Sequence, residues 1–208
     1  LETFFEHGRK MVGLQTALVD RALRVAPEPG GPPLYSDGRM AELMKDPVFS
    51  SRTVRAEPYV VYKLAPGTDA GSVGPKLDRL ARLGDLYAFW HRETPWLKSL
   101  YFGSADGFLV GYPGGTPFPA DYDPRKRDWY RKAVEKGRVT WSNIYLDKDR
   151  LPVITCAEPL FQDGGLAGVS AADVGLESLL DRLFSFGELP AVDALLVNYL
   201  GQVRIAAT

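Results

Sequence analysis

The chain has 208 residues, of which 45% are apolar and 12% aromatic, so its composition is that of a globular domain rather than a disordered chain. With 25 basic and 26 acidic residues its formal net charge is −1, which argues against nucleic acid as a partner. The single cysteine excludes an intrachain disulfide, and no apolar run approaches the roughly 18 residues that cross a bilayer.

Residues 1–26 contain no proline and predict one continuous helix. A seven-residue apolar recurrence gives this helix a seam, formed by Phe4, Met11, Leu18 and Val25. The helix would be roughly 39 Å long, more than one small module needs, so we expect it to pack on both its own module and the fragment after Pro190. Small and polar residues interrupt the seam, which predicts at most weak pairing with a second copy.

The next part of the chain mixes loops with short elements. In chain order we expect a loop at 27–33, a short helix at 39–45, a strand at 59–64, a loop at 66–74 and a helix at 77–91. Residues 97–103 and 108–112 then form a β-hairpin, because Asp106-Gly107 supplies a tight turn. The two histidines, His7 and His91, lie on separate predicted helices, so no metal site and no cofactor are expected.

The stretch from Tyr122 to Tyr145 carries most of the chemistry. An Asp-Pro pair at 123–124 predicts a helix start and Gly137 predicts its end. Three basic residues at 125–127 then fall in the first turn, where the helix dipole disfavours cations. This conflict indicates a bound carboxylate or phosphate, although the three side chains could equally point into water and pair with neighbouring aspartates.

Two more hairpins follow. Residues 151–161 and 166–173 pair around a Gly-rich turn, with Cys156 expected as a small buried hydrophobe. Asp173 stands where this hairpin runs into a helix, so it is either an N-cap or a ligand contact. Residues 194–197 and 203–206 form the last hairpin.

Four segments together resemble the ligand-binding module of double Cache (dCache) sensor domains: Tyr122–Tyr130, Trp141–Tyr145, Pro152–Pro159 and Gly168–Asp173. The resemblance implies an α+β fold, in which a long N-terminal helix packs on a PAS-like antiparallel sheet. It also implies three parts: a helix and linker at 1–48, a membrane-distal ligand-binding module at 49–188, and the start of a small or truncated second module at 189–208. Such domains lie outside the cytoplasmic membrane in bacterial chemoreceptors and histidine kinases. We therefore expect a periplasmic piece of a longer membrane protein, with transmembrane helices on either side.

Some members of this family share an amino-acid-binding pattern, and it matches Tyr122, Arg127, Trp129, Tyr130, Tyr145 and Asp173. The resemblance implies that the first Tyr, the Arg and the Trp hold the ligand's α-carboxylate. The later aromatic residues and the Asp would hold its α-amine. Asp128, where many relatives have proline, is a departure that could weaken the pull of Arg127 on a carboxylate.

The expected function is thus an amino-acid sensor without enzymatic activity, since no catalytic triad, paired catalytic carboxylates or phosphate-binding loop is visible. Two alternatives remain open. The domain could bind another small carboxylate or amine, or it could be a ligand-free interaction module that dimerises through its N-terminal helix.

Overall fold

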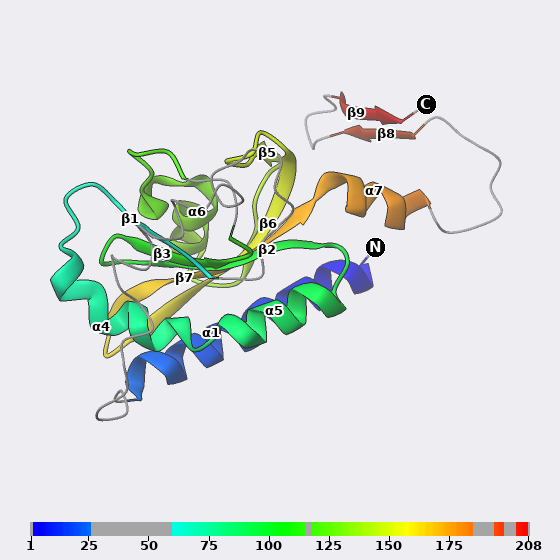
Figure 1. Ribbon diagram of the computed structural model, residues 1–208. Helices are drawn as coiled ribbons and strands as arrows, with labels where there is room; N and C mark the ends of the chain where they lie inside the picture. The colour runs from blue at the N-terminus through cyan, green and yellow to red at the C-terminus, as the bar shows by residue number, and fades with distance from the viewer. Residues whose placement is uncertain (1, 26–59, 115–117, 185–193, 198–202, 208) are drawn as a thin grey trace.

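A computed structural model describes residues 2–25, 60–114, 118–184, 194–197 and 203–207 (Figure 1). The predicted loop at 27–33 and short helix at 39–45 lie outside this part of the chain. The main sheet has its strands in the order β1-β3-β2-β7-β6-β4, with β5 paired to β6, and every pairing is antiparallel. The strands are β1 (Val61–Leu64), β2 (Leu97–Ser104), β3 (Phe108–Tyr112), β4 (Thr140–Trp141), β5 (Tyr145–Leu146), β6 (Pro152–Gln162) and β7 (Gly165–Gly175).

Helices cover both faces of this sheet (Figure 1). One face carries α1 (Glu2–Arg24), α4 (Ala70–Ala81) and α5 (Gly84–Glu93), while the other carries α6 (Asp128–Lys136). This arrangement is the PAS-like α+β fold that the sequence predicts, and the predicted strands form in it. Turn geometry explains the two long hairpins: Gly107 has φ 91°, and Asp163 and Gly164 have φ 50° and 82°.

The helical region before β2 differs from the prediction. Instead of a loop at 66–74 and one helix at 77–91, two helices form, and the first begins at Ala70. Asp69 caps it by accepting a hydrogen bond from the backbone N–H of Ser72 at 2.8 Å. A turn closed by Leu83 N–H on the carbonyl of Leu80, at 3.0 Å, then separates α4 from α5.

The N-terminal helix is continuous, as predicted, but its buried face shares only Phe4 with the seven-residue seam. The side facing the sheet is formed by Phe4, Gly8, Val12, Gln15, Thr16 and Val19. Leu14 and Val25 are 52% and 56% exposed. Small and β-branched residues are used because the helix lies close to the sheet: a Cβ on Gly8 would lie 2.5 Å from Cζ2 of Trp141.

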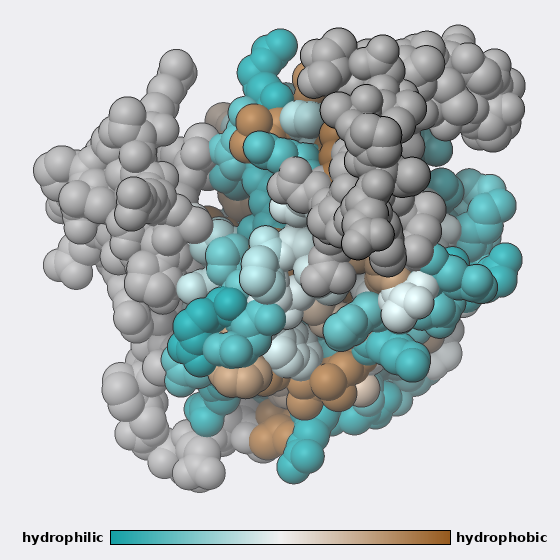
Figure 2. All heavy atoms as spheres, turned by 90° about the vertical axis from the view of Figure 1, so that its right-hand side faces the viewer, coloured by the Kyte–Doolittle hydropathy of each residue, from teal (hydrophilic) through white to brown (hydrophobic). Residues whose placement is uncertain are grey.

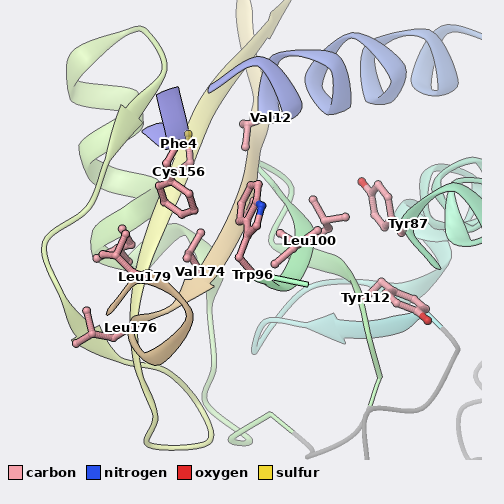
Figure 3. Packing of buried hydrophobic residues seen from close by; sticks show 13 residues of the cluster. Phe4, Val12, Tyr87, Trp96, Leu100, Tyr112, Cys156, Val174, Leu176 and Leu179 are labelled. Atoms are coloured by element: carbon pink, nitrogen blue, oxygen red, sulfur yellow. The ribbon is translucent and has the colours of Figure 1, made fainter. Parts of the chain in front are cut away.

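The largest apolar cluster lies between α1 and the sheet. Figure 3 shows Phe4 and Val12 of α1 beside Cys156 of β6, Val174 of β7 and Trp96, which precedes β2. Cys156 is fully buried there, and burial raises the pKa of its thiol to about 12. It is therefore the small core hydrophobe that the sequence predicts.

Beyond β7 the chain continues into α7 (Leu176–Phe184) and a hairpin of β8 (Ala194–Val197) and β9 (Val203–Ala207). Figure 1 shows this hairpin past the end of α7 and apart from α1, so the predicted packing of α1 on the fragment after Pro190 is not seen in the described residues.

Viewed from the α7 side, small groups of hydrophobic side chains lie among hydrophilic ones (Figure 2). No described helix combines the length and hydropathy of a membrane span.

Candidate ligand-binding site

A cavity of about 320 Å³ lies on the face of the sheet that carries α6. Strands β2 and β3 supply its floor, and the segment from Phe118 to Trp129 and the turn after β5 supply its walls. This volume is at the lower end of the range of small-molecule pockets, which suits a compact ligand.

The segment that positions the basic residues is broken where the sequence predicts a single helix. Residues Pro124–Lys126 form a 3₁₀ turn, capped by Asp123, and α6 begins only at Asp128. Between them Arg127 is extended, with φ −79° and ψ 148°. The first turn of α6 therefore begins with an acidic residue, which suits the helix dipole. Gly137 ends α6 in the left-handed conformation, as predicted, with φ 61°.

The three basic residues have different environments. Arg125 makes a two-pronged contact with Asp123, from Nε at 2.9 Å and from Nη2 at 2.8 Å. Lys126 is exposed to solvent. Arg127 lines the cavity with its guanidinium carbon 5.5 Å from the centre of the Tyr122 ring, and it has no carboxylate partner among the described residues.

Asp128 does not neutralise Arg127. Its carboxylate accepts a hydrogen bond from Arg131 at 2.6 Å, and its side chain is 78% exposed. The departure from the family pattern thus places a negative charge in solvent beside α6, where it leaves the guanidinium of Arg127 available to the cavity.

Asp173 lies within β7 and is 7% exposed. Its carboxylate accepts hydrogen bonds from Ser99 Oγ at 3.0 Å, from Tyr101 Oη at 2.6 Å and from Thr155 Oγ1 at 2.6 Å. The alternative role as an N-cap is therefore wrong: α7 begins three residues later, and the carboxylate is bonded by side chains of neighbouring strands.

Burial raises the pKa of the Asp173 carboxyl, although the hydrogen bonds from Thr155, Tyr101 and Ser99 act against this rise. No cation is paired with this carboxylate among the described residues. A positively charged group placed in the cavity would stabilise its ionised form, because it would offset the lost solvation.

Aromatic residues surround the two charged groups. Trp129 is 2% exposed, and its ring lies edge-on to that of Tyr101 with centroids 5.0 Å apart. Burial raises the pKa of the hydroxyl groups of Tyr101, Tyr122 and Tyr145. These tyrosines therefore stay protonated at neutral pH and can act as hydrogen-bond donors.

Five of the six residues predicted for the site line the cavity: Tyr122, Arg127, Trp129, Tyr145 and Asp173. Tyr130 does not line it. It is 5% exposed, and its ring packs edge-on against the Trp129 ring, with centroids 5.5 Å apart. The role of all six residues in binding stays a prediction, although Tyr130 could reach a ligand only through its contact with Trp129.

Several residues that line the site were not assigned from sequence. Ser99 and Tyr101 are two residues apart on β2, so their side chains lie on the same face of the sheet. The alternation of the predicted hairpin could have indicated both. Lys98 and Asp147 form an ion pair at the cavity wall, and Lys148 pairs with Asp149 beside it at 3.1 Å. His91, expected at a helix end or on the surface, lies in the last turn of α5 and lines the cavity.

The PAS-like sheet carries a small cavity with one buried carboxylate and one guanidinium that has no ionic partner in the described residues, an arrangement that suits a small charged molecule. Residues 101–181 match the sequence model of the first PDC sensor domain of methyl-accepting chemotaxis protein-like proteins. This part of the chain is therefore similar to the PDC sensor domains of such receptors, in line with its resemblance to double Cache domains.

Curated relatives also match a part of the chain. The methyl-accepting chemotaxis protein PscA of Pseudomonas syringae pv. tomato is 42% identical over 81 residues, which are 38% of this chain and 13% of PscA. PctB of Pseudomonas aeruginosa is 36% identical over 93 residues, covering 42% of this chain and 15% of PctB. The chain thus spans only a small part of the curated relatives it matches.

Solved structures share the fold. The ligand-binding domain of the amino acid chemoreceptor PctC of P. aeruginosa, in complex with GABA, superposes with a TM-score of 0.53 and 21% identity, covering 97% of this chain and 68% of that one. The ligand-binding domain of the chemoreceptor Tlp3 of Campylobacter jejuni, in complex with L-norvaline, superposes with a TM-score of 0.52 and 16% identity. That match covers 99% of this chain and 70% of the Tlp3 chain.

Proposed function

We propose that the chain is the extracytoplasmic ligand-binding part of a membrane receptor and that it binds a free L-amino acid. One observation carries this proposal: the cavity combines the buried carboxylate of Asp173 with the guanidinium of Arg127, which no carboxylate of the described residues pairs with. A zwitterion with both an α-carboxylate and an α-ammonium would neutralise both groups at once.

The proposed contacts follow from donor and acceptor chemistry. Arg127 binds the α-carboxylate through its guanidinium fork, with Tyr122 and the indole N–H of Trp129 as further donors. Asp173 accepts from the α-ammonium, and Tyr145 closes that side. A ligand without one of the two charges leaves a protein charge unpaired, so we expect it to bind much more weakly.

The names of related structures support an amino-acid ligand, since PctC is described as an amino acid chemoreceptor and the Tlp3 domain was solved with L-norvaline. The domain itself acts as a binding module and not as an enzyme. Cys156, its one thiol, lies in the core with a raised pKa and is no nucleophile. Another small carboxylate or amine as ligand, or a ligand-free interaction module, is the alternative.

We further propose the division that the family resemblance implies, with a helix and linker at 1–48, the ligand-binding module at 49–188 and the beginning of a second module at 189–208. Transmembrane helices would flank this periplasmic part and connect it to a cytoplasmic output domain. Met11, Leu14, Leu18 and Val25 are not fully buried on α1 and would contact a second copy in the receptor dimer. This stripe is short and interrupted, so sedimentation velocity should show the isolated domain as a monomer or weak dimer.

A thermal-shift panel tests the ligand class. At a ligand concentration a hundred times the Kd, binding adds about 2.7 kcal/mol to the free energy of unfolding, which corresponds to a melting shift of about 5–10 °C. We expect at least one of the twenty L-amino acids to give such a shift, while its amide and its decarboxylated amine give little. A panel with no shift, or an amine that acts as well as the amino acid, would contradict the proposal.

A further inference from the structure

Four of the six charged residues that line the cavity are paired with one another. Its described lining contains three cations and three carboxylates, namely Lys98, Arg127, Lys148, Asp147, Asp149 and Asp173. Lys98 pairs with Asp147, and Lys148 pairs with Asp149 at 3.1 Å. Only Arg127 and Asp173 are left without an ionic partner in the described residues, and the proposed function assigns these two to the ligand's α-groups.

A β-bulge places Lys98 at the cavity. Leu97 is paired with Val174 and Ser99 with Asp173, so Lys98 is the extra residue of β2 and has no partner in β7. A bulge of this kind redirects a side chain that would otherwise point to the opposite face of the sheet. The side chain of Lys98 is 25% exposed and that of its partner Asp147 is 8% exposed.

Asp147 is held in a fixed position. Its Oδ1 accepts hydrogen bonds from the backbone N–H groups of Asp149 at 2.8 Å and Leu151 at 2.9 Å, while its Oδ2 accepts from Lys98. The turn after β5 thus fixes Oδ1, and Oδ2 can accept from another cation only when Lys98 is absent. Lys148 is similarly occupied, because its ammonium also lies 5.6 Å from the centre of the Phe118 ring.

The rest of the wall is mostly apolar or aromatic, and includes Val61, Leu100, Leu109, Tyr112, Pro113 and Phe118. His91 also lines it, and burial lowers the pKa of this imidazole, so it is neutral at pH 7. A charged ligand side chain would lose solvation at this wall and find every neighbouring charge already paired.

We propose that the ligand's side chain is uncharged, and that the Lys98–Asp147 ion pair enforces this selectivity by occupying both charges that could otherwise bind a charged side chain. This inference rests on the proposed function and adds the class of amino acid to it. Breaking the pair on one side should therefore change the selectivity in a direction set by the remaining charge.

Isothermal titration of the whole chain tests this. For the wild type we expect Leu, Val, Met or Phe to bind at least roughly tenfold more tightly than Lys, Arg, Asp or Glu. Lys98→Met frees Asp147 and should improve the affinity for Lys and Arg relative to the neutral ligands. Asp147→Asn keeps an oxygen for the two backbone N–H groups but frees Lys98, so it should favour Asp and Glu. Lys76→Met breaks an exposed ion pair with Asp106 away from the cavity and should leave the selectivity unchanged.

The outcomes separate the two proposals. If no amino acid binds the wild type, the proposed function fails. If Lys or Glu binds the wild type as tightly as Leu, or if both single variants keep the wild-type selectivity, only the inference about the side chain is overturned. Should Lys98→Met fail to fold, the double variant Lys98→Met/Asp147→Asn removes both charges and should still prefer neutral ligands; acceptance of charged ones would also overturn the inference.

Discussion

Asp173 is a buried carboxylate whose hydrogen-bond partners are hydroxyl groups, without a cation among the described residues. Such a group is costly to ionise, and its raised pKa expresses this cost. The site therefore holds a charge whose stabilisation depends on a ligand, which is a common feature of binding sites.

This predicts a pH-dependent effect of Asp173→Asn on the ligand-free protein. Because the folded pKa of Asp173 is raised, ionisation destabilises the fold as the pH rises from about 4 through that raised pKa. Asn does not titrate, so the melting temperature of the variant relative to the wild type should be higher at pH 7 than at pH 4. Calorimetry without ligand measures this difference, and a difference that does not change with pH would contradict the account.

Asp123→Asn is a control variant for which the effect of pH on the melting temperature should have the opposite sign. The Arg125 side chain, which donates hydrogen bonds to Asp123, lowers the pKa of this carboxyl. A lowered pKa contributes stability that is present above about pH 4 and is lost as the pH falls through the folded pKa. Asp123→Asn should therefore lower the melting temperature more at pH 7 than at low pH.

Prediction of single residues from the sequence had a clear physical limit. Arg127 and Asp173 were assigned to the site through family resemblance. The local sequence pattern alone allowed Arg127 to face either an anion or solvent, and it allowed Asp173 to be either a helix cap or a ligand contact. Lys98 was missed because a bulge depends on how two strands pair, and the sequence of one strand does not reveal it. Tyr130 was predicted for the site, but it is not among the residues that line the cavity, and its ring packs against that of Trp129.

At the scale of elements, the hairpins were predictable because Asp-Gly turns and alternating apolar residues are local signals. The break between Lys126 and Asp128 was not, since Asp-Pro and Gly137 fit one uninterrupted helix equally well. The face of α1 was predicted wrongly for a similar reason. A helix that packs closely on a sheet buries small residues, and a search for large apolar side chains instead selects Met11, Leu18 and Val25, which are half-buried or exposed.

Gly8 tests the close approach of α1. Ala is the better helix former by about 1 kcal/mol, but a Cβ at this position would lie 2.5 Å from the Trp141 ring. We expect Gly8→Ala to lower the free energy of unfolding by roughly 1–2 kcal/mol in urea titrations. Gly74→Ala in α4 is the matched control: with no atom within 4 Å of the new Cβ, it should raise stability by about 0.5–1 kcal/mol. Equal effects at both positions would argue against close packing at Gly8.

At the scale of the whole molecule, the cavity and the N-terminal helix share one residue of β2. Gln15 of α1 is fully buried and donates a hydrogen bond to the backbone carbonyl of Tyr101 at 2.9 Å. The hydroxyl group of the same tyrosine donates to Asp173 at 2.6 Å. The buried face of α1 is thus bonded to the strand whose side chains contact the proposed ammonium site.

The measurement that tests the central claim most directly is a set of Kd values for matched ligands and variants. Isothermal titration would compare the best amino acid, its decarboxylated amine and its deaminated acid on the wild type, Arg127→Ala and Asp173→Ala, with Lys126→Ala as control. Removing the ligand's carboxylate should weaken binding to the wild type strongly, but should weaken binding to Arg127→Ala only slightly. In the same way, removing the ligand's ammonium should weaken binding to the wild type strongly and binding to Asp173→Ala only slightly. If the losses simply add for both matched pairs, Arg127 and Asp173 do not bind these groups and the account is wrong.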